Sequence, residues 1–154
     1  MTIENLILQL QSVLKPSDAD FYSDDVKNIL WFYRSSDWRE YININDETYN
    51  KEVVFRNDIF EIIIITWGKN QGADVHDHAD NGCWMKILDG SLEEKLYDKD
   101  LNILNTNILK KGAMGFMNND KGYHSISNTN DGITVSLHIY NPPNHNTKYF
   151  KKLK

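Results

Sequence analysis

Apolar residues near the start of the chain recur at the spacing of an α-helix. The pattern predicts a helix that begins after Thr2, whose hydroxyl can cap it, and that ends before Pro16, which lacks an amide hydrogen. A second helix is predicted from Ser23 or Asp24 onward. One apolar side on each helix indicates that the two form a lid on something larger. The apolar positions are Ile3, Leu6, Ile7, Leu10, Val13 and Leu14 in the first helix, and Val26, Ile29, Leu30 and Tyr33 in the second.

From Val53 onward, short β-branched and aromatic runs alternate with turn residues. Asp-Gly at 89–90 and at 131–132 lies between apolar runs, which is a strong hairpin signal. Residues 62–65 are four consecutive isoleucines, as expected of a strand buried on both faces. Many short strands at close spacing favour a sandwich or barrel. The predicted strands are 52–56, 59–67, 73–78, 83–88, 92–97, 103–109, 115–117, 122–127 and 133–140.

Length, composition and charge limit the class of protein. The 154 residues, 40% apolar and 25% charged, suit one folded domain with a core. We expect one domain over 1–154, with a mainly helical segment at 1–48, a barrel at 49–143 and a tail at 144–154. A net charge of −5 gives no basic surplus for binding nucleic acid or an anionic membrane. Without a membrane-length apolar run or a signal-peptide start, a cytoplasmic protein is expected.

Two histidines separated by one residue give the first chemical signal. On a strand, His76 and His78 would point to the same face, where two imidazoles can bind one metal ion; the alternative is a pair of surface histidines. His124 opens another predicted strand and could be a third ligand, although a lone histidine is more often hydrogen-bonded in a core. Together, in the all-β context of this part of the chain, the three histidines indicate a metal centre. Imidazole alone leaves zinc, nickel and manganese open beside iron.

This order of residues resembles the cupin superfamily and, within it, cysteine dioxygenase. Cys83, the only cysteine, stands where many cupins carry a glutamate ligand. The resemblance extends over about residues 49–143 and implies a mainly β fold, a cupin-type β-barrel (jelly roll) with N-terminal α-helices. The matching residues are Trp67-Gly68, Gly72, His76-Asp77-His78, Cys83, Leu88-Asp89-Gly90-Ser91-Leu92, His124 and the segment 136–143.

The resemblance implies an iron-dependent oxidoreductase that uses O₂ to oxidise the thiol of L-cysteine to a sulfinate. His76, His78 and His124 would hold Fe(II). Three neutral imidazoles leave the centre more positive than a set with a carboxylate, which favours a bound thiolate. A small thiol and O₂ would be the partners, without nucleic acid or membrane, and a monomer is favoured.

The family match also assigns roles beside the metal. Cys83 and Tyr140 match a pair that forms a thioether crosslink in part of the family; the alternatives are a small buried thiol and a half-buried aromatic ring. Ser136, His138 and Tyr140 share a face by strand period and match a relay in which the histidine orients the phenol. The alternative interpretation of these three residues is that they form the polar face of a half-exposed strand. The family tends to have a cis peptide at Asn141-Pro142.

Substrate recognition is where the sequence departs from the family. The Tyr-x-Arg pattern that clamps the cysteine carboxylate falls on Tyr49 and Lys51, and lysine keeps the charge but loses the two-pronged guanidinium fit. If 52–56 is a regular strand that Lys51 enters, Arg56 has the opposite parity and cannot face the same cavity. Trp67 matches a substrate-pocket position, or is plain core. His145 is assigned to the surface.

Two other functions stay open. Relatives that act on 3-mercaptopropionate tend to lack both the arginine clamp and the crosslinking cysteine, so Lys51 favours such a substrate and Cys83 opposes it. A cupin that binds a metal or small ligand without catalysis is the other alternative. A zinc or nickel isomerase is less favoured, because nothing supplies the usual acidic ligand near His78: Glu93 and Glu94 come only after Gly90.

Overall fold

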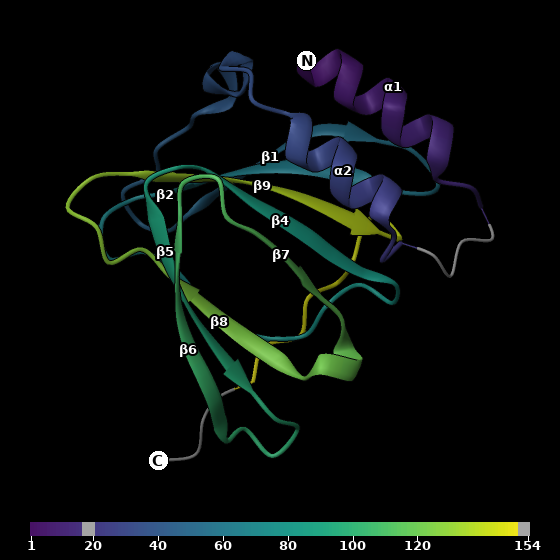
Figure 1. Ribbon diagram of the computed structural model, residues 1–154. Coiled ribbons are helices and arrows are strands. Elements are labelled where there is room, and N and C mark those ends of the chain that lie inside the picture. Colours follow the sequence, from purple (N-terminus) through teal and green to yellow (C-terminus); the bar gives the residue numbers. More distant parts are fainter. Residues whose placement is uncertain (17–20, 151–154) are drawn as a thin grey trace.

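A computed structural model describes residues 1–16 and 21–150 of the chain (Figure 1). Its helices are α1 (Ile3–Val13) and α2 (Asp24–Phe32), with 3-10 helices η1 (Asp37–Tyr41) and η2 (Asn119–Lys121). Its strands are β1 (Asn50–Arg56), β2 (Glu61–Trp67), β3 (Gly72–His76), β4 (Gly82–Asp89), β5 (Ser91–Tyr97), β6 (Ile103–Lys110), β7 (Met114–Met117), β8 (Tyr123–Ser127) and β9 (Thr134–Asn141).

Both predicted helices are confirmed, together with the predicted cap Thr2, and the structure adds Ser23 as the cap of α2. The Thr2 hydroxyl accepts from the Asn5 amide at 3.2 Å, and the Ser23 hydroxyl accepts from the Val26 amide at 3.2 Å. The buried sides of α1 and α2 share one apolar cluster with the outer face of the sheet that contains β2, β9 and β4 (Figure 1). Within the described residues, no helix is both long and apolar enough to cross a membrane.

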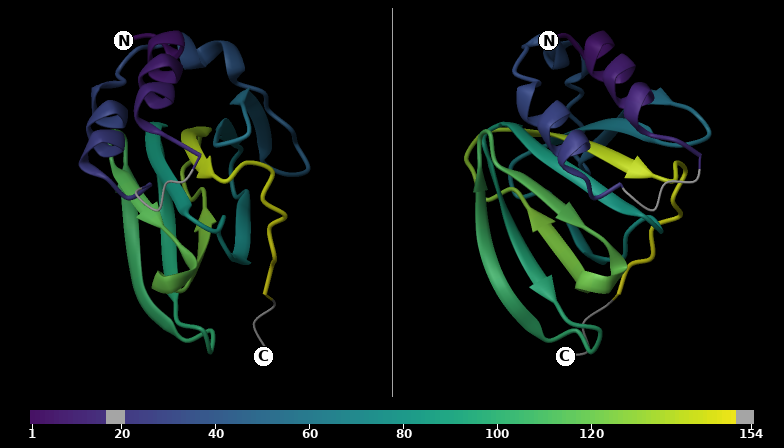
Figure 2. Two further views of the ribbon diagram at one scale, coloured as in Figure 1. Left: turned by 90° about the vertical axis from the view of Figure 1, so that its right-hand side faces the viewer. Right: turned by 45° about the vertical axis from the view of Figure 1, so that its right-hand side comes forward.

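The strands form two sheets that face each other (Figure 2). The first has the order β1-β2-β9-β4-β7, and the second has the order β3-β8-β5-β6. The predicted mainly β fold with N-terminal helices is therefore confirmed. The strand pairs found in the described residues do not close the two sheets into one hydrogen-bonded barrel, so the architecture is an open sandwich.

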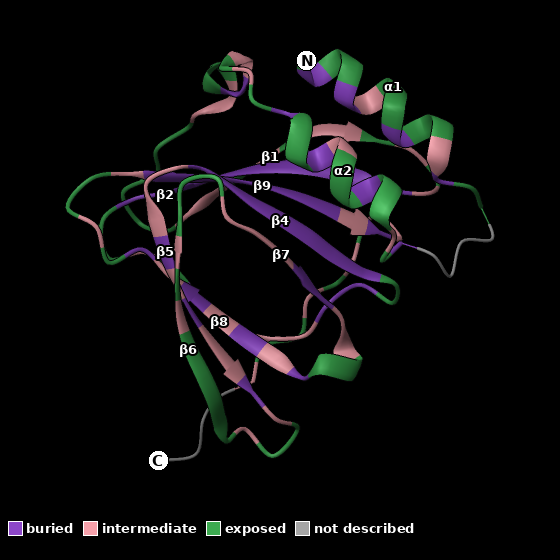
Figure 3. Ribbon diagram, viewed as in Figure 1, coloured by how far each residue is buried: buried purple, intermediate pink, exposed green. Residues whose placement is uncertain are grey.

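Strand β2 is buried along its whole length, as the isoleucine run predicts (Figure 3). Ile62 and Ile64 belong to the cluster under the helices. Ile63 and Ile65 belong to a second cluster between the sheets. Side chains alternate along a strand, so this one strand lies between two apolar cores. Its outer face packs against the helical lid, and its inner face belongs to the wall of the cavity.

A bulge in β1 changes the expected facing of two basic residues. The register pairs Lys51 with Ile65 and Arg56 with Glu61, and it shifts between Val53 and Phe55. The extra residue brings Arg56 back to the face of Lys51, so the prediction of opposite faces, made for a regular strand, is wrong. The Arg56 side chain donates from Nε to Glu61 Oε2 at 2.7 Å, and of the two basic residues only Lys51 lines the central cavity.

Lys86 on β4 ties the helical lid to the sheet. Its ammonium donates to the carbonyl oxygens of Leu30, Trp31 and Tyr33 at 2.9, 3.1 and 2.7 Å. Carbonyl groups at the C-terminal end of a helix have no partner within the helix, and a cation there also interacts favourably with the negative end of the helix dipole. Lys86 is only 5% exposed, so it satisfies groups that water reaches poorly.

We therefore expect Lys86→Met to lower the free energy of unfolding by about 2–4 kcal/mol, because three carbonyls lose a charged donor. Guanidinium denaturation followed by circular dichroism measures the change. Lys95→Met on β5 is the control: that side chain is 41% exposed, and its replacement should shift stability by about 0.5 kcal/mol or less. Equal losses in the two variants would contradict the capping role.

Candidate metal centre

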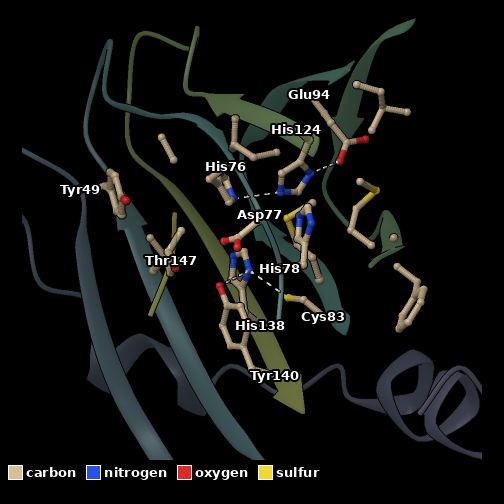
Figure 4. Close-up of a pocket in the computed structure, with 18 of the residues that line it drawn as sticks. Tyr49, His76, Asp77, His78, Cys83, Glu94, His124, His138, Tyr140 and Thr147 are labelled. Carbon is tan, nitrogen blue, oxygen red and sulfur yellow. Dashed lines mark hydrogen bonds and ion pairs between the residues drawn. The ribbon is translucent and has the colours of Figure 1, made fainter. Parts of the chain in front are cut away.

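Three histidines converge on a cavity between the two sheets (Figure 4). His76 ends β3 and lies opposite His124 of β8 in the strand register. The ligand nitrogens of these two residues and of His78 all lie within 4.8 Å of one another. The predicted convergence is confirmed for all three.

His78 reaches the cavity by a different route from the one predicted. The strand predicted over 73–78 ends at His76, so strand alternation does not place His78. Instead, the His78 amide donates to Asn119 Oδ1 at 2.8 Å, and Asn119 Nδ2 donates to the His78 carbonyl at 3.1 Å. This pair of bonds to η2 holds the turn that aims the imidazole inward.

The outer nitrogens of two rings have acceptors that set their tautomers. His76 Nδ1 is 2.7 Å from the Asp74 carbonyl oxygen, and His124 Nδ1 is 2.8 Å from a Glu94 carboxylate oxygen. Each Nδ1 donates to its oxygen, so in the neutral ring each Nε2 carries a lone pair. The two Nε2 atoms face each other at 3.1 Å. Two such lone pairs repel unless a cation lies beside both, and nitrogens about 2.1 Å from one ion at right angles are about 3 Å apart.

His78 gives a second indication of a bound cation. It is 2% exposed, and neither of its ring nitrogens has a hydrogen-bond partner among residues 1–16 and 21–150. Buried polar nitrogens are almost always paired, so an unpartnered imidazole directed at two others fits a metal ligand. Burial, followed by the charge of His124, lowers the pKa of His76 to about 3, and the same causes lower the pKa of His78. Neutral rings are the form that binds metal.

A second polar cluster lies on β9 beside the histidines. Trp67 donates from Nε1 to the Ser136 hydroxyl at 2.8 Å, and Ser136 Oγ is 2.8 Å from His138 Nε2. Ser136 is buried, and among the described residues His138 Nε2 is the one hydrogen-bond partner of its hydroxyl that can accept, so the hydroxyl proton points to His138. The other ring nitrogen, Nδ1, is then the protonated one, and it lies 3.5 Å from the Tyr140 hydroxyl. The shared face predicted for Ser136, His138 and Tyr140 is thus confirmed, with Ser136 behind the cavity wall.

Burial sets the protonation of this cluster. It is the main cause that lowers the pKa of His138 well below its usual value, followed by the charge of Lys51. Burial, followed by the neighbouring Cys83, raises the pKa of Tyr140 well above its usual value. The imidazole is therefore neutral and the phenol keeps its proton. With His138 Nδ1–H donating to the phenol oxygen, the phenol proton is free to point into the cavity.

Cys83 and Tyr140 are direct neighbours across the β4–β9 ladder. Directly paired residues in antiparallel strands have Cβ atoms about 4.5–5.5 Å apart. Cys83 Sγ is also 3.8 Å from His138 Nδ1, and burial raises the pKa of the Cys83 thiol to about 12. The two candidate crosslink partners are therefore together, as a thiol and a phenol. The Asn141-Pro142 peptide is cis, as predicted.

The opposite wall carries the predicted substrate residues. Tyr49, Lys51 and Trp67 all line the cavity. The Tyr49 and Trp67 rings stack with centroids 4.6 Å apart, and Lys51 Nζ lies 5.8 Å from the centre of the Tyr49 ring. No carboxylate of the described residues forms an ion pair with Lys51. The cavity, of about 180 Å³, is smaller than the roughly 300–1,000 Å³ of drug-sized sites, so it suits a small molecule.

The sequence analysis missed several residues of this site. Glu94 could have been found from β5, where it shares the inward parity of Leu92 and Leu96. His145 is not at the surface as predicted: its Nε2 lies 2.8 Å from Asp77 Oδ1, and its side chain is 18% exposed. Thr147 and Tyr149 also line the cavity, from a segment predicted as a tail. No local pattern marks these last residues.

Comparisons with known proteins agree with this geometry. The family described as Cysteine dioxygenase type I matches residues 1–153. Cysteine dioxygenase type 1 of Danio rerio is 28% identical over 97% of this chain and 79% of its own. The protein of the same name from Rattus norvegicus is 29% identical over 92% of this chain and 75% of its own.

The likeness to solved structures confirms the cupin-type fold and carries no information on function. A Klebsiella pneumoniae protein with a double-stranded β-helix domain has a TM-score of 0.62 at 16% identity, over 74% of this chain and 94% of its own. A cupin superfamily protein from Desulfitobacterium hafniense has a TM-score of 0.54 at 13% identity, over 66% of this chain and 84% of its own. On the match along almost its whole length, the chain belongs to the cysteine dioxygenase type I family.

Proposed function

We propose that the protein is an Fe(II)-dependent thiol dioxygenase that oxidises L-cysteine to cysteine sulfinate. Both atoms of O₂ join the sulfur of the thiolate, so that RS⁻ and O₂ become RSO₂⁻. The observation that supports this best is the set of His76, His78 and His124 in a small cavity, where the ring nitrogens of His78 have no hydrogen-bond partner in the described part of the chain. The relatives named cysteine dioxygenase support the choice of reaction.

His76, His78 and His124 would hold the iron, and the convergence of their ring nitrogens fits that role. The iron, when bound, supplies open positions for a thiolate and O₂ and the redox chemistry that joins them. The protein residues around it orient the ligands. The Glu94 carboxylate and the Asp74 carbonyl hold two imidazoles in the tautomer that leaves Nε2 free.

Tyr140 would donate its phenol proton to the substrate or to its developing oxygens. The chain of hydrogen bonds from Trp67 through Ser136 to His138 leaves that proton available. Tyr140 is the residue that faces the reacting atoms, whereas Ser136 and His138 act by positioning it. Burial of these groups excludes water, which strengthens each of their hydrogen bonds.

Lys51 would bind the substrate carboxylate, since it is a cation in the cavity without a carboxylate partner. Tyr49 and Trp67 form the wall beside it. A lysine in place of the family arginine makes 3-mercaptopropionate the second candidate substrate, because that thiol carries the same carboxylate without the amine. Cys83, next to Tyr140, favours cysteine.

The function is tested by O₂ consumption of the Fe(II)-loaded protein with L-cysteine and 3-mercaptopropionate in parallel, and the products are identified by mass spectrometry. Cysteine sulfinate as the preferred product is the expected result. Preference for the other thiol would support the second candidate. Iron binding without O₂ uptake with either thiol would contradict dioxygenase activity and favour a metal-binding role.

The effect of adding and removing iron should differ between a variant of the candidate ligand His78 and a variant of a histidine that is not a ligand. Iron at about 100 times its Kd should raise the free energy of unfolding of the wild type by about 2.7 kcal/mol, and a chelator should reverse this. In His78→Ala we expect no such effect and no retained iron. His145→Ala, which removes the partner of Asp77, is the control and should keep both. Thermal unfolding and elemental analysis measure the outcome, and iron retained by His78→Ala would refute its assignment as a ligand.

The Cys83–Tyr140 pair should form a thioether during aerobic turnover. One hydrogen leaves each partner, and O₂ takes up the two electrons and two protons. Intact-mass spectrometry should show a species lighter by two hydrogens in the wild type, and a single uncrosslinked species in Cys83→Ser. If the wild type keeps its unmodified mass after turnover, Cys83 is a buried apolar residue only.

A further inference from the structure

The segment that follows β9 forms part of the cavity wall. The Asp77 amide donates to the Lys148 carbonyl at 3.0 Å, and the Phe150 amide donates to the Val75 carbonyl at 2.8 Å. These bonds lay the chain along β3, and Figure 2 shows it running down the side of the molecule from the end of β9. Residues 144–150, predicted as a tail, are thus part of the site, and 151–154 lie outside the described residues.

Asp77, which lies between the candidate metal ligands His76 and His78 in the sequence, anchors this segment. One of its carboxylate oxygens accepts from the Lys148 amide at 2.8 Å and faces His145 Nε2 at 2.8 Å. The neighbouring residue Tyr149 pairs with His76 in an isolated β-bridge, and their ring centroids are 5.8 Å apart. The position of Tyr149 is therefore set by contacts with the histidine site itself.

The phenol of Tyr149 meets a second phenol at the mouth of the cavity. The hydroxyl oxygens of Tyr49 and Tyr149 are 3.0 Å apart. In a pair of hydroxyls only one donates to the other, so one proton stays free for a third group. Tyr149 is 47% exposed, and Lys51 lies over the ring of Tyr49. This side of the cavity therefore carries both an ammonium near the Tyr49 ring and one phenol O–H that is free to donate.

We propose that Tyr149, with Tyr49 and Lys51, binds the carboxylate of the thiol substrate. The ammonium takes one oxygen of the carboxylate, and the free phenol hydroxyl donates to the other. A lysine alone is a point charge without the paired donors of a guanidinium, and the two phenols supply the second donor. The inference rests on the proposed function, because it takes the ligand to be a thiol with a carboxylate.

A structural role for Tyr149 predicts something different from a binding role. If the ring only closes the mouth, loss of its hydroxyl should affect all thiols equally or none. If the hydroxyl binds the carboxylate, its loss should weaken only ligands that carry one. L-cysteine and cysteamine are suitable probes, because cysteamine has the thiol and the amine of cysteine without its carboxylate.

The test is anaerobic calorimetric titration of the Fe(II)-loaded protein with each thiol. Tyr149→Phe keeps the ring and should raise the Kd of L-cysteine about 10-fold, as expected for one hydrogen bond to a charged group, with no change for cysteamine. Tyr123→Phe is the control: that ring stacks on Phe150 of the same segment but does not line the cavity. It should leave both Kd values unchanged.

A double variant tests whether the two donors share one ligand group. If Lys51 and Tyr149 hold the same carboxylate, the loss in Lys51→Met/Tyr149→Phe should be smaller than the product of the two single losses. Wild-type affinity for L-cysteine in Tyr149→Phe, equal weakening of cysteamine, or no binding of L-cysteine by the wild type would each overturn the proposal. These binding results are independent of turnover, so a failure of the dioxygenase reaction is recognised separately.

Discussion

The double pairing of β9 is the constraint on which the rest of the structure depends. This strand lies between β2 and β4, so it is bonded on both sides and its register is strongly held. Its alternate residues therefore face two different environments. Val135, Leu137 and Ile139 enter the core beneath the helices, and Ser136, His138 and Tyr140 face the other way. A slip by one residue would exchange the two sets and destroy both the core and the site.

Among the described residues, the buried polar side chains around this cavity have hydrogen-bond partners, with one exception. Trp67 pairs with Ser136, Ser136 with His138, and His124 with Glu94. An unpaired buried polar group costs roughly 1–3 kcal/mol, so such pairing is the expected state. His78 is the exception, since both its ring nitrogens lack a partner. That exception has a chemical meaning, because a bound cation would use a lone pair that no protein donor satisfies.

The cavity joins parts of the chain that are far apart in sequence. Lys51 and Tyr49 come from the region of β1, the three histidines from β3, the turn after it and β8, and Tyr149 from beyond β9. Asp77 links two of these parts, because it lies between His76 and His78 in the sequence and bonds to the segment that carries Tyr149. That segment therefore belongs to the cavity wall, although it looks like a surface tail in the sequence.

The sequence by itself determined the features that depend on near neighbours. Helix caps, the isoleucine strand and the shared face of Ser136, His138 and Tyr140 follow from periods of a few residues, and all are confirmed. Only the tertiary structure decided the rest. The bulge in β1 placed Arg56 against Glu61, and packing against β3 brought His145 to Asp77 and Tyr149 to Tyr49. The physical reason is that periodicity acts between near neighbours, whereas a bulge, a turn held by a distant side chain and a segment docked on another strand depend on contacts between residues far apart in the sequence.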